Sequence, residues 1–121
     1  MPIKVADNEV RAIARYVGMS PQKVRLVVDL VRGRAVKEAL DLLRFTNKAA
    51  AEPISKLIVS AVSNATENKE MAADDLVISK IFADPAPTRH WRRFAARGRF
   101  RPILRKSSHI TVVLKEKEEQ E

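Results

Sequence analysis

The chain has 121 residues, of which 45% are apolar, so it is long enough to bury one modest core but too short for two domains. It contains no cysteine and no apolar run of about 18 residues, which excludes disulfides, thiolate metal sites and a membrane-spanning helix. The net charge of +8 and the isoelectric point near 10.2 are typical of proteins that bind nucleic acid.

The first predicted element is a half-buried β-strand over residues 10–17. Residues 1–9 before it are polar and lack the apolar segment of a secretory signal, so we expect a cytosolic protein. Apolar and polar residues alternate in part along the strand, and Gly18 ends it. One side of the strand is expected to carry Val10, Ala12, Ala14 and Tyr16.

The second predicted element is a helix between Ser20 and Gly33. Ser20 is a good N-cap, Pro21 suits the first helical position, and Gly33 supplies a C-terminal stop. Apolar residues cover much of the circumference, so we expect this helix to be central: Val24, Leu26, Val27, Val28, Leu30 and Val31. The side chains expected to project outward from it are Lys23, Arg25 and Arg32.

Two further helices are predicted over residues 36–45 and about 47–68. The shorter one has a buried stripe of Val36, Ala39, Leu40 and Leu43. The longer one has a buried face of Ile54, Leu57, Ile58, Ala61, Val62 and Ala65. Pro53 would remove a backbone donor inside a helix capped at Asn47, so we expect either a kink there or a start at Glu52.

Two β-strands are predicted over residues 76–83 and 108–115, and antiparallel pairing between them would make the intervening chain project as a long ribbon. The ribbon should turn near Ala96, Arg97 and Gly98. With about ten residues per side at roughly 3.3 Å each, it could reach about 30 Å. Such a ribbon is too thin to bury a core, so we expect it to be mobile until a partner orders it.

These elements predict a single α+β domain over residues 1–121. Its body, residues 10–84 and 107–115, should consist of three helices packed on a three-stranded antiparallel sheet. A protruding basic β-hairpin over residues 85–106, which we call the arm, should extend from this body. Residues 116–121 form an acidic tail.

The arm carries the entire excess charge of the protein. Residues 88–106 hold eight cations and no acidic residue, so the 23 basic and 15 acidic residues of the chain balance everywhere else. Seven of the eight are arginines, whose planar guanidinium groups bind phosphate oxygens in pairs and stack on bases. The arm is therefore predicted to bind nucleic acid rather than a lipid surface.

Aromatic residues are interleaved with these cations. Trp91, Phe94 and Phe100 could stack on unpaired bases, at about 1–3 kcal/mol per base. Alternatively, they could pack on one another as a small hydrophobic cluster inside the hairpin.

No catalytic, metal or cofactor site is predicted. The pattern Ser20-x-x-Lys23 matches a serine-acylating signature, but a helix cap explains it better because the companion motifs are absent. His90 and His109 have no neighbouring carboxylate or second ligand at metal spacing. We therefore expect no enzyme and no small-molecule substrate.

The sequence resembles large-subunit ribosomal protein twenty-two in several blocks from Ala12 to Leu114. These blocks are residues 14–16, 20–33, 39–48, 60–65, 96–99 and 107–113. The resemblance implies a bacterial-like structural protein of the large ribosomal subunit, in the cytoplasm or in an organelle. Its implied partners are large-subunit ribosomal RNA and neighbouring ribosomal proteins, whose assembly it helps to organise. The resemblance also implies that the arm lines the nascent-peptide exit tunnel and meets the nascent peptide at its tip.

Taken with the charge pattern, the resemblance implies these RNA-binding residues: Arg15, Lys23, Arg25, Arg89, His90, Trp91, Arg92, Arg93, Arg97, Arg99, Arg101, Arg105, Lys106 and His109. The residues implied at the tunnel tip are Ala95, Ala96, Arg97, Gly98 and Arg99. The alternative from another class is an architectural DNA-binding protein that lays a basic β-ribbon into a groove. Such proteins are usually symmetric dimers. A membrane partner is not expected, because the arm lacks a continuous apolar face.

Overall fold

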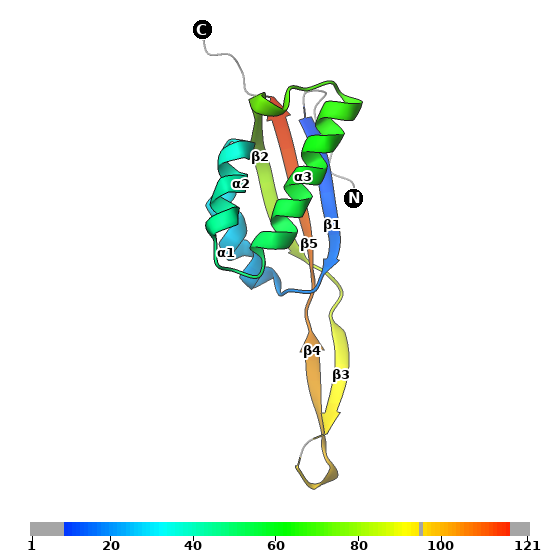
Figure 1. Ribbon diagram of the computed structural model, residues 1–121. Coiled ribbons are helices and arrows are strands. Elements are labelled where there is room, and N and C mark those ends of the chain that lie inside the picture. Colours follow the sequence, from blue (N-terminus) through cyan, green and yellow to red (C-terminus); the bar gives the residue numbers. More distant parts are fainter. Residues whose placement is uncertain (1–8, 95, 117–121) are drawn as a thin grey trace.

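The computed structural model describes residues 9–94 and 96–116, which form an α+β body and a two-stranded arm (Figure 1). The body sheet is antiparallel with strand order β1 (Glu9–Val17), β5 (Ser108–Glu116), β2 (Leu76–Pro85). Three helices cover one face of this sheet: α1 (Pro21–Val31), α2 (Val36–Phe45) and α3 (Ala51–Asn68). A short 3-10 helix, η1 (Ala73–Asp75), precedes β2. The predicted fold class is confirmed.

The core lies between the helices and the central strand β5. Because β5 pairs with both β1 and β2, its helix-facing side chains are enclosed from both sides, and Ile110, Val112 and Leu114 are fully buried. From α3, Ile54 and Ile58 pack into the same cluster and are also fully buried. The predicted pairing of the last two body strands is confirmed, and they extend two residues and one residue beyond their predicted ends.

The predicted start and stop of α1 are confirmed. Ser20 is its N-cap and accepts a hydrogen bond from the backbone N–H of Lys23 at 3.5 Å, and Pro21 occupies the first position. Gly33 follows the helix with φ of 77°, a left-handed conformation that glycine adopts without steric cost.

The expectation that α1 is central is wrong. Only one side of the helix packs inward, through Val24, Val27, Val28 and Val31. Leu26 and Leu30 are 61% and 44% exposed. The sheet and its helices form two layers, so α1 has a packing partner on one side, and apolar residues on its opposite side meet solvent.

The kink expected at Pro53 is also unnecessary. Helix α3 begins at Ala51, one residue before the alternative start predicted at Glu52, so Pro53 is its third residue. The first N–H groups of a helix have no intrahelical acceptor, so a proline there loses no backbone hydrogen bond.

The predicted alternation of β1 fails at Tyr16. Val10 and Ala12 are buried as expected, but the register with β5 shifts between Ala14 and Val17. Tyr16 adopts a positive φ of 56° in this irregularity, and its side chain is 65% exposed. A β-bulge redirects the side chains that follow it, which explains why Tyr16 leaves the buried side of the strand.

Candidate nucleic-acid interface

The arm is an antiparallel ribbon of β3 (Arg89–Phe94) and β4 (Phe100–Arg105) that projects away from the body (Figure 1). Its register sets Arg89 opposite Arg105 and Arg93 opposite Arg101. Like charges at directly opposed positions weaken strand pairing. A polyanion placed along the ribbon would remove this repulsion, which fits the predicted RNA-binding role of these residues.

The tip of the arm is a tight turn at the predicted position. The 3-10 helix η2 (Ala96–Gly98) contains Arg97 with φ of 62° and Gly98 with φ of 71°. Two consecutive left-handed residues reverse the chain sharply, and a side chain at either position is strained there. Arg97 and Arg99 are exposed, so the tip presents cations to its surroundings. Ala95, the remaining predicted tip residue, lies outside the described residues.

Several predicted RNA-binding side chains reach solvent. Those that are exposed are Arg15, Lys23, Arg25, Arg97, Arg99, Arg105 and Lys106. Six further predicted residues lie in the arm strands, where the strand register gives their positions along the ribbon: Arg89, His90, Trp91, Arg92, Arg93 and Arg101. The predicted set therefore spans both the arm and the adjoining end of the body.

The arm begins where β2 and β5 leave the body, and backbone contacts join its two sides there. The N–H of Ala86 donates to the carbonyl of Ser107 at 2.9 Å. The fully buried Ser108 donates its hydroxyl to the carbonyl of Met19 at 2.6 Å. These contacts tie the base of the arm to the loop that leads into α1, so body and arm are connected at a defined point.

Tyr16 and His109 meet at this junction. The backbone N–H of Tyr16 donates to Nδ1 of His109 at 3.1 Å, and the two rings make an edge contact with centroids 4.8 Å apart. Because Nδ1 is an acceptor, a neutral His109 carries its proton on Nε2. Tyr16 also lines a cavity of about 380 Å³ together with Arg105 and Lys106 of the arm. His109 thus has a structural contact in addition to its predicted RNA contact, and Tyr16 is a candidate that sequence reasoning missed.

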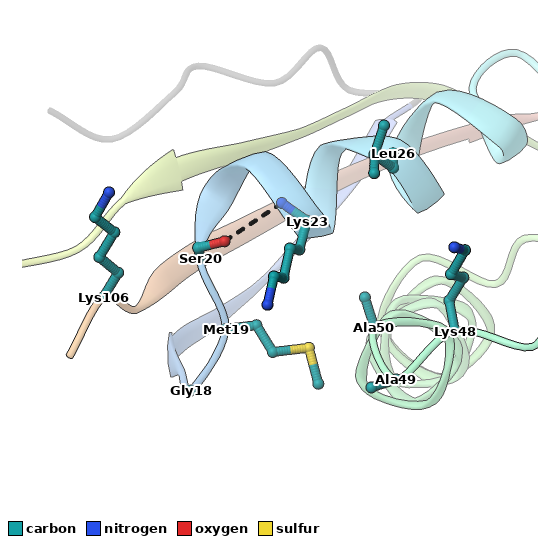
Figure 2. A pocket seen from close by; sticks show the side chains of 9 residues that line it. All are labelled: Gly18, Met19, Ser20, Lys23, Leu26, Lys48, Ala49, Ala50 and Lys106. Carbon is teal, nitrogen blue, oxygen red and sulfur yellow. Dashed lines mark hydrogen bonds between the residues drawn. The ribbon is translucent and has the colours of Figure 1, made fainter. Parts of the chain in front are cut away.

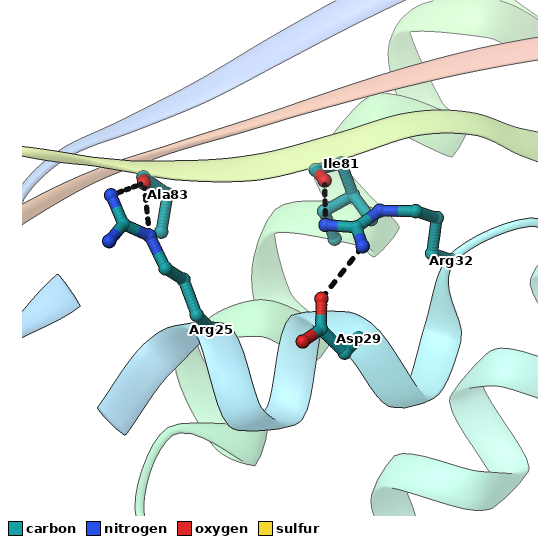
Figure 3. Close-up of polar contacts among 5 residues, drawn as sticks. All are labelled: Arg25, Asp29, Arg32, Ile81 and Ala83. Atoms are coloured by element: carbon teal, nitrogen blue, oxygen red, sulfur yellow. Dashed lines mark hydrogen bonds and ion pairs between the residues drawn. The ribbon is translucent and has the colours of Figure 1, made fainter. Parts of the chain in front are cut away.

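Two arginines expected to project outward are exposed, and their guanidinium groups also bind the free edge of the sheet (Figure 3). Arg25 donates from Nε and Nη2 to the carbonyl of Ala83 at 3.1 and 3.0 Å, and Arg32 donates to the carbonyl of Ile81 at 3.1 Å. The carbonyl of Arg34 accepts from the N–H of Ile78 on the same strand at 2.9 Å. Together these contacts satisfy backbone groups of β2 that no other strand pairs, which protects the edge against association with another chain.

The helices and their flanking turns neutralise several cations through exposed ion pairs. Among the described residues these are Arg32–Asp29, Arg34–Glu38, Lys37–Asp74 and Lys56–Glu52. The hydrogen bond from Lys37 to Asp74 raises the pKa of that lysine. Exposed pairs of this kind contribute little stability, and they show that cations and carboxylates are interspersed on the surface of the helices.

Two further kinds of feature, a metal-binding cluster and a membrane-spanning helix, are not found in the part of the chain that the structure describes. Residues 9–94 and 96–116 contain no group of three or more side chains suited to hold a metal ion. None of the described helices is both long and apolar enough to cross a membrane.

The sequence matches the model of the family described as "Ribosomal protein L22p/L17e" over residues 12–115. The chain belongs to this family. The match covers almost the same span as the resemblance from Ala12 to Leu114, so the family predicted from the sequence is confirmed. Members of this family are structural ribosomal proteins, so the prediction that the chain is not an enzyme is also confirmed.

Curated relatives agree with the family match. The "Large ribosomal subunit protein uL22" of Desulfitobacterium hafniense is 50% identical over 112 residues, which cover 93% of this chain and 98% of the relative. The protein of the same name from a Thermoanaerobacter species is 49% identical, covering 91% of this chain and 99% of the relative. That from Desulforamulus reducens is 45% identical, covering 92% and 98%.

Proposed function

We propose that this chain is a component of the large ribosomal subunit that binds large-subunit ribosomal RNA through its arm. The observation that carries the proposal is the separation of charge. The arm is a thin ribbon whose residues 88–106 hold eight cations and no acidic residue, whereas the rest of the chain has equal numbers of acidic and basic residues. A ribbon of this kind can pass between RNA helices and neutralise phosphates on several of them. Family membership and the printed names of the relatives support the same assignment.

In this proposal the body holds the arm in place while the arm binds RNA. Strands β2 and β5 remain paired as far as Pro85 and Ser108, and the bond between Ala86 and Ser107 continues the connection into the arm. The RNA segments on either side of the ribbon are thereby held at a fixed separation. Such a clamp would help to organise the RNA during subunit assembly, with other ribosomal proteins as neighbours in the cytoplasmic ribosome.

We further propose that the tip lines the exit tunnel and contacts the nascent peptide. The sharp turn at Arg97 and Gly98 makes the end of the arm narrow, and Arg97 and Arg99 are exposed on it. A narrow cationic tip can reach a confined channel in RNA that a folded domain could not enter.

The assignment to the ribosome is tested by sedimentation of the tagged protein from a cell lysate through a sucrose gradient. We expect it to co-migrate with the large subunit and to remain there after a high-salt wash, because many phosphate contacts and the threaded arm hold it together. Migration as a free protein would contradict the proposal. Migration as a dimer that prefers duplex DNA to ribosomal RNA at matched salt would instead support the architectural DNA-binding alternative.

The tunnel assignment is tested separately with a cross-link from the tip. The chain contains no cysteine, so Arg97→Cys introduces a unique thiol. On stalled ribosomes, a short bismaleimide linker should join this thiol to a single cysteine placed in the nascent peptide at one narrow range of distances from the peptidyl-transfer site. The matched control is Lys56→Cys on α3, which should give no such product. Absence of the cross-link with Arg97→Cys at every peptide position would overturn the tunnel assignment and leave RNA binding intact.

A further inference from the structure

The junction between body and arm contains a strained residue. Tyr16 has φ of 56°, and a bulky side chain at positive φ persists only where its surroundings hold the backbone in place. The register of β1 with β5 shifts here, so that Arg15 and Tyr16 together lie opposite His109. The N–H of Tyr16 donates to a side chain, Nδ1 of His109, rather than to a carbonyl of β5. His109 is therefore the acceptor that holds this bulge.

Two neighbouring residues of β5 anchor the bulge in different ways. The loop that follows Tyr16 leads through Met19 to the start of α1 (Figure 2). The hydroxyl of Ser108 donates to the carbonyl of Met19, and neither group changes its charge near neutral pH. The bond from the N–H of Tyr16 to His109 is different, because it exists only while Nδ1 carries no proton. One anchor is therefore permanent and the other depends on the protonation of His109.

Tyr16 also connects the bulge to the arm. Its ring meets the ring of His109 edge-on, with centroids 4.8 Å apart. The other residues that line its cavity of about 380 Å³ belong to the two sides of the arm at its base, residues 87–88 and 105–107. A change in the backbone at Tyr16 therefore moves a residue that lies between His109 and the base of the arm.

The charged and titratable groups around His109 come from both neighbouring strands and from the arm. On β1, the bulge places Arg15 and Tyr16 opposite it, and on β2 Asp84 lies opposite it in the register. Two cations of the arm line the cavity beside Tyr16: Arg105 and Lys106. Because β5 lies between β1 and β2, the acceptor role toward Tyr16 and the carboxylate of Asp84 are on opposite sides of the imidazole. A neutral ring is held toward β1, whereas an imidazolium ion has an acidic partner toward β2.

We propose that Tyr16 and His109 form a protonation-sensitive joint that fixes the base of the arm while His109 is neutral and loosens it when His109 is protonated. A proton on Nδ1 removes the acceptor and sets two N–H groups against each other. The strained backbone at Tyr16 then relaxes, and the base of the arm loses its contact with the bulge. The joint is intact at high pH and is lost as the pH falls through the range in which histidine takes up a proton, about pH 8 to 5. It belongs to the free protein and does not depend on what the arm binds.

The test is a pH titration of the full chain followed by nuclear magnetic resonance. The nitrogen-15 shift of Nδ1 reports the protonation of His109. As His109 is protonated, the protection of the Tyr16 amide against hydrogen exchange should fall at least about fivefold, the equivalent of one net hydrogen bond. The Ala86 amide, which donates to Ser107 across the base of the arm, should lose protection with the same midpoint. The Ile58 amide in α3 is the internal control and should not change, which excludes global unfolding.

Two variants separate His109 from the other groups. Asparagine can offer its side-chain oxygen as an acceptor but takes up no proton, so His109→Asn should keep Tyr16 and Ala86 protected throughout the titration. The matched control is His90→Asn, which removes the other histidine of the chain and should leave the pH response unchanged. Side-chain carboxylates ordinarily titrate below this range, so their titration does not produce the response.

The joint would be overturned by constant protection of Tyr16 while the Nδ1 shift reports protonation of His109. Loss of protection at Tyr16 without any at Ala86 would show that the bulge does not hold the arm, and would overturn it too. A response that persists in His109→Asn, or that disappears in His90→Asn, would assign the pH dependence to another group and have the same consequence. Circular dichroism verifies that each variant keeps its helices before the titrations are compared. If His109→Asn does not fold, the coincidence of the three midpoints in the unmodified chain and in His90→Asn still decides the proposal.

Discussion

Replacing residues 88–106 by a two-residue Asn-Gly turn should leave a folded body that binds ribosomal RNA far more weakly. All three helices and the three-stranded sheet lie outside the deleted segment, so the helical circular dichroism should be retained. The deletion removes eight cations. If each contacts one phosphate, the slope of log affinity against log salt falls by about 6 to 7, since each contact contributes about 0.7–0.9. When the salt concentration rises from 50 to 200 mM, the loss of affinity in the deletion variant would then be smaller than the loss in the wild type by a factor on the order of 10⁴.

A second variant separates the charge of the arm from its length. Changing the same eight cations to glutamine keeps the ribbon but should reproduce most of the lost salt dependence. Full affinity in this variant would show that shape rather than charge carries the binding. Loss of helical signal in the deletion would show that the arm is not separable from the body, because the three helices would then depend on it.

The double variant Arg25→Met, Arg32→Met should lower the free energy of unfolding by about 2 kcal/mol and make the protein more prone to associate. Methionine keeps the aliphatic stem but cannot donate hydrogen bonds to the carbonyls of Ala83 and Ile81. Each of the two carbonyls that loses its guanidinium partner costs about 1 kcal/mol, and an unprotected strand edge invites pairing with another chain. Urea unfolding and analytical ultracentrifugation measure the two effects.

The control for this variant is Arg44→Met on α2, an exposed arginine for which the described residues show no hydrogen bond, and a change below about 0.5 kcal/mol is expected. For Arg25→Met alone, the slope of log RNA affinity against log salt then separates the two roles considered for Arg25, which are binding the sheet edge and contacting RNA. A stability loss at unchanged slope assigns Arg25 to the sheet edge. A lower slope at unchanged stability would contradict the structural role and support the predicted RNA contact.

Local chemistry accounts for the parts of the fold that were predicted correctly. Helix α2 has the predicted bounds because its apolar residues recur at helical spacing on a single face. Ser20 and Gly33 mark the ends of α1 through capping and left-handed geometry, which depend on the residues themselves. The turn of the arm at Ala96 to Gly98 follows from a glycine placed midway between two extended segments.

The candidate site was predicted only in part, because it depends on segments that are distant in sequence. The run of arm cations is visible in the sequence, since eight like charges within 88–106 need no tertiary information. The contacts of Arg25 with Ala83 and of Arg32 with Ile81 are not visible, because the partners lie 58 and 49 residues apart in the sequence and meet only when α1 packs beside β2. Tyr16 was misplaced because nothing local signals the shift in register between β1 and β5.

The sequence by itself therefore determined that this protein has an α+β body of balanced charge and a basic arm, and that it belongs to a family of ribosomal proteins. These properties depend on residue type, spacing and charge within short windows. The tertiary structure decided that β5 lies at the centre of the sheet, that α1 is covered on one side, and that Arg25 and Arg32 hold a strand edge. Those outcomes depend on which segments pack together, and long-range packing selects among arrangements that local patterns leave equally open.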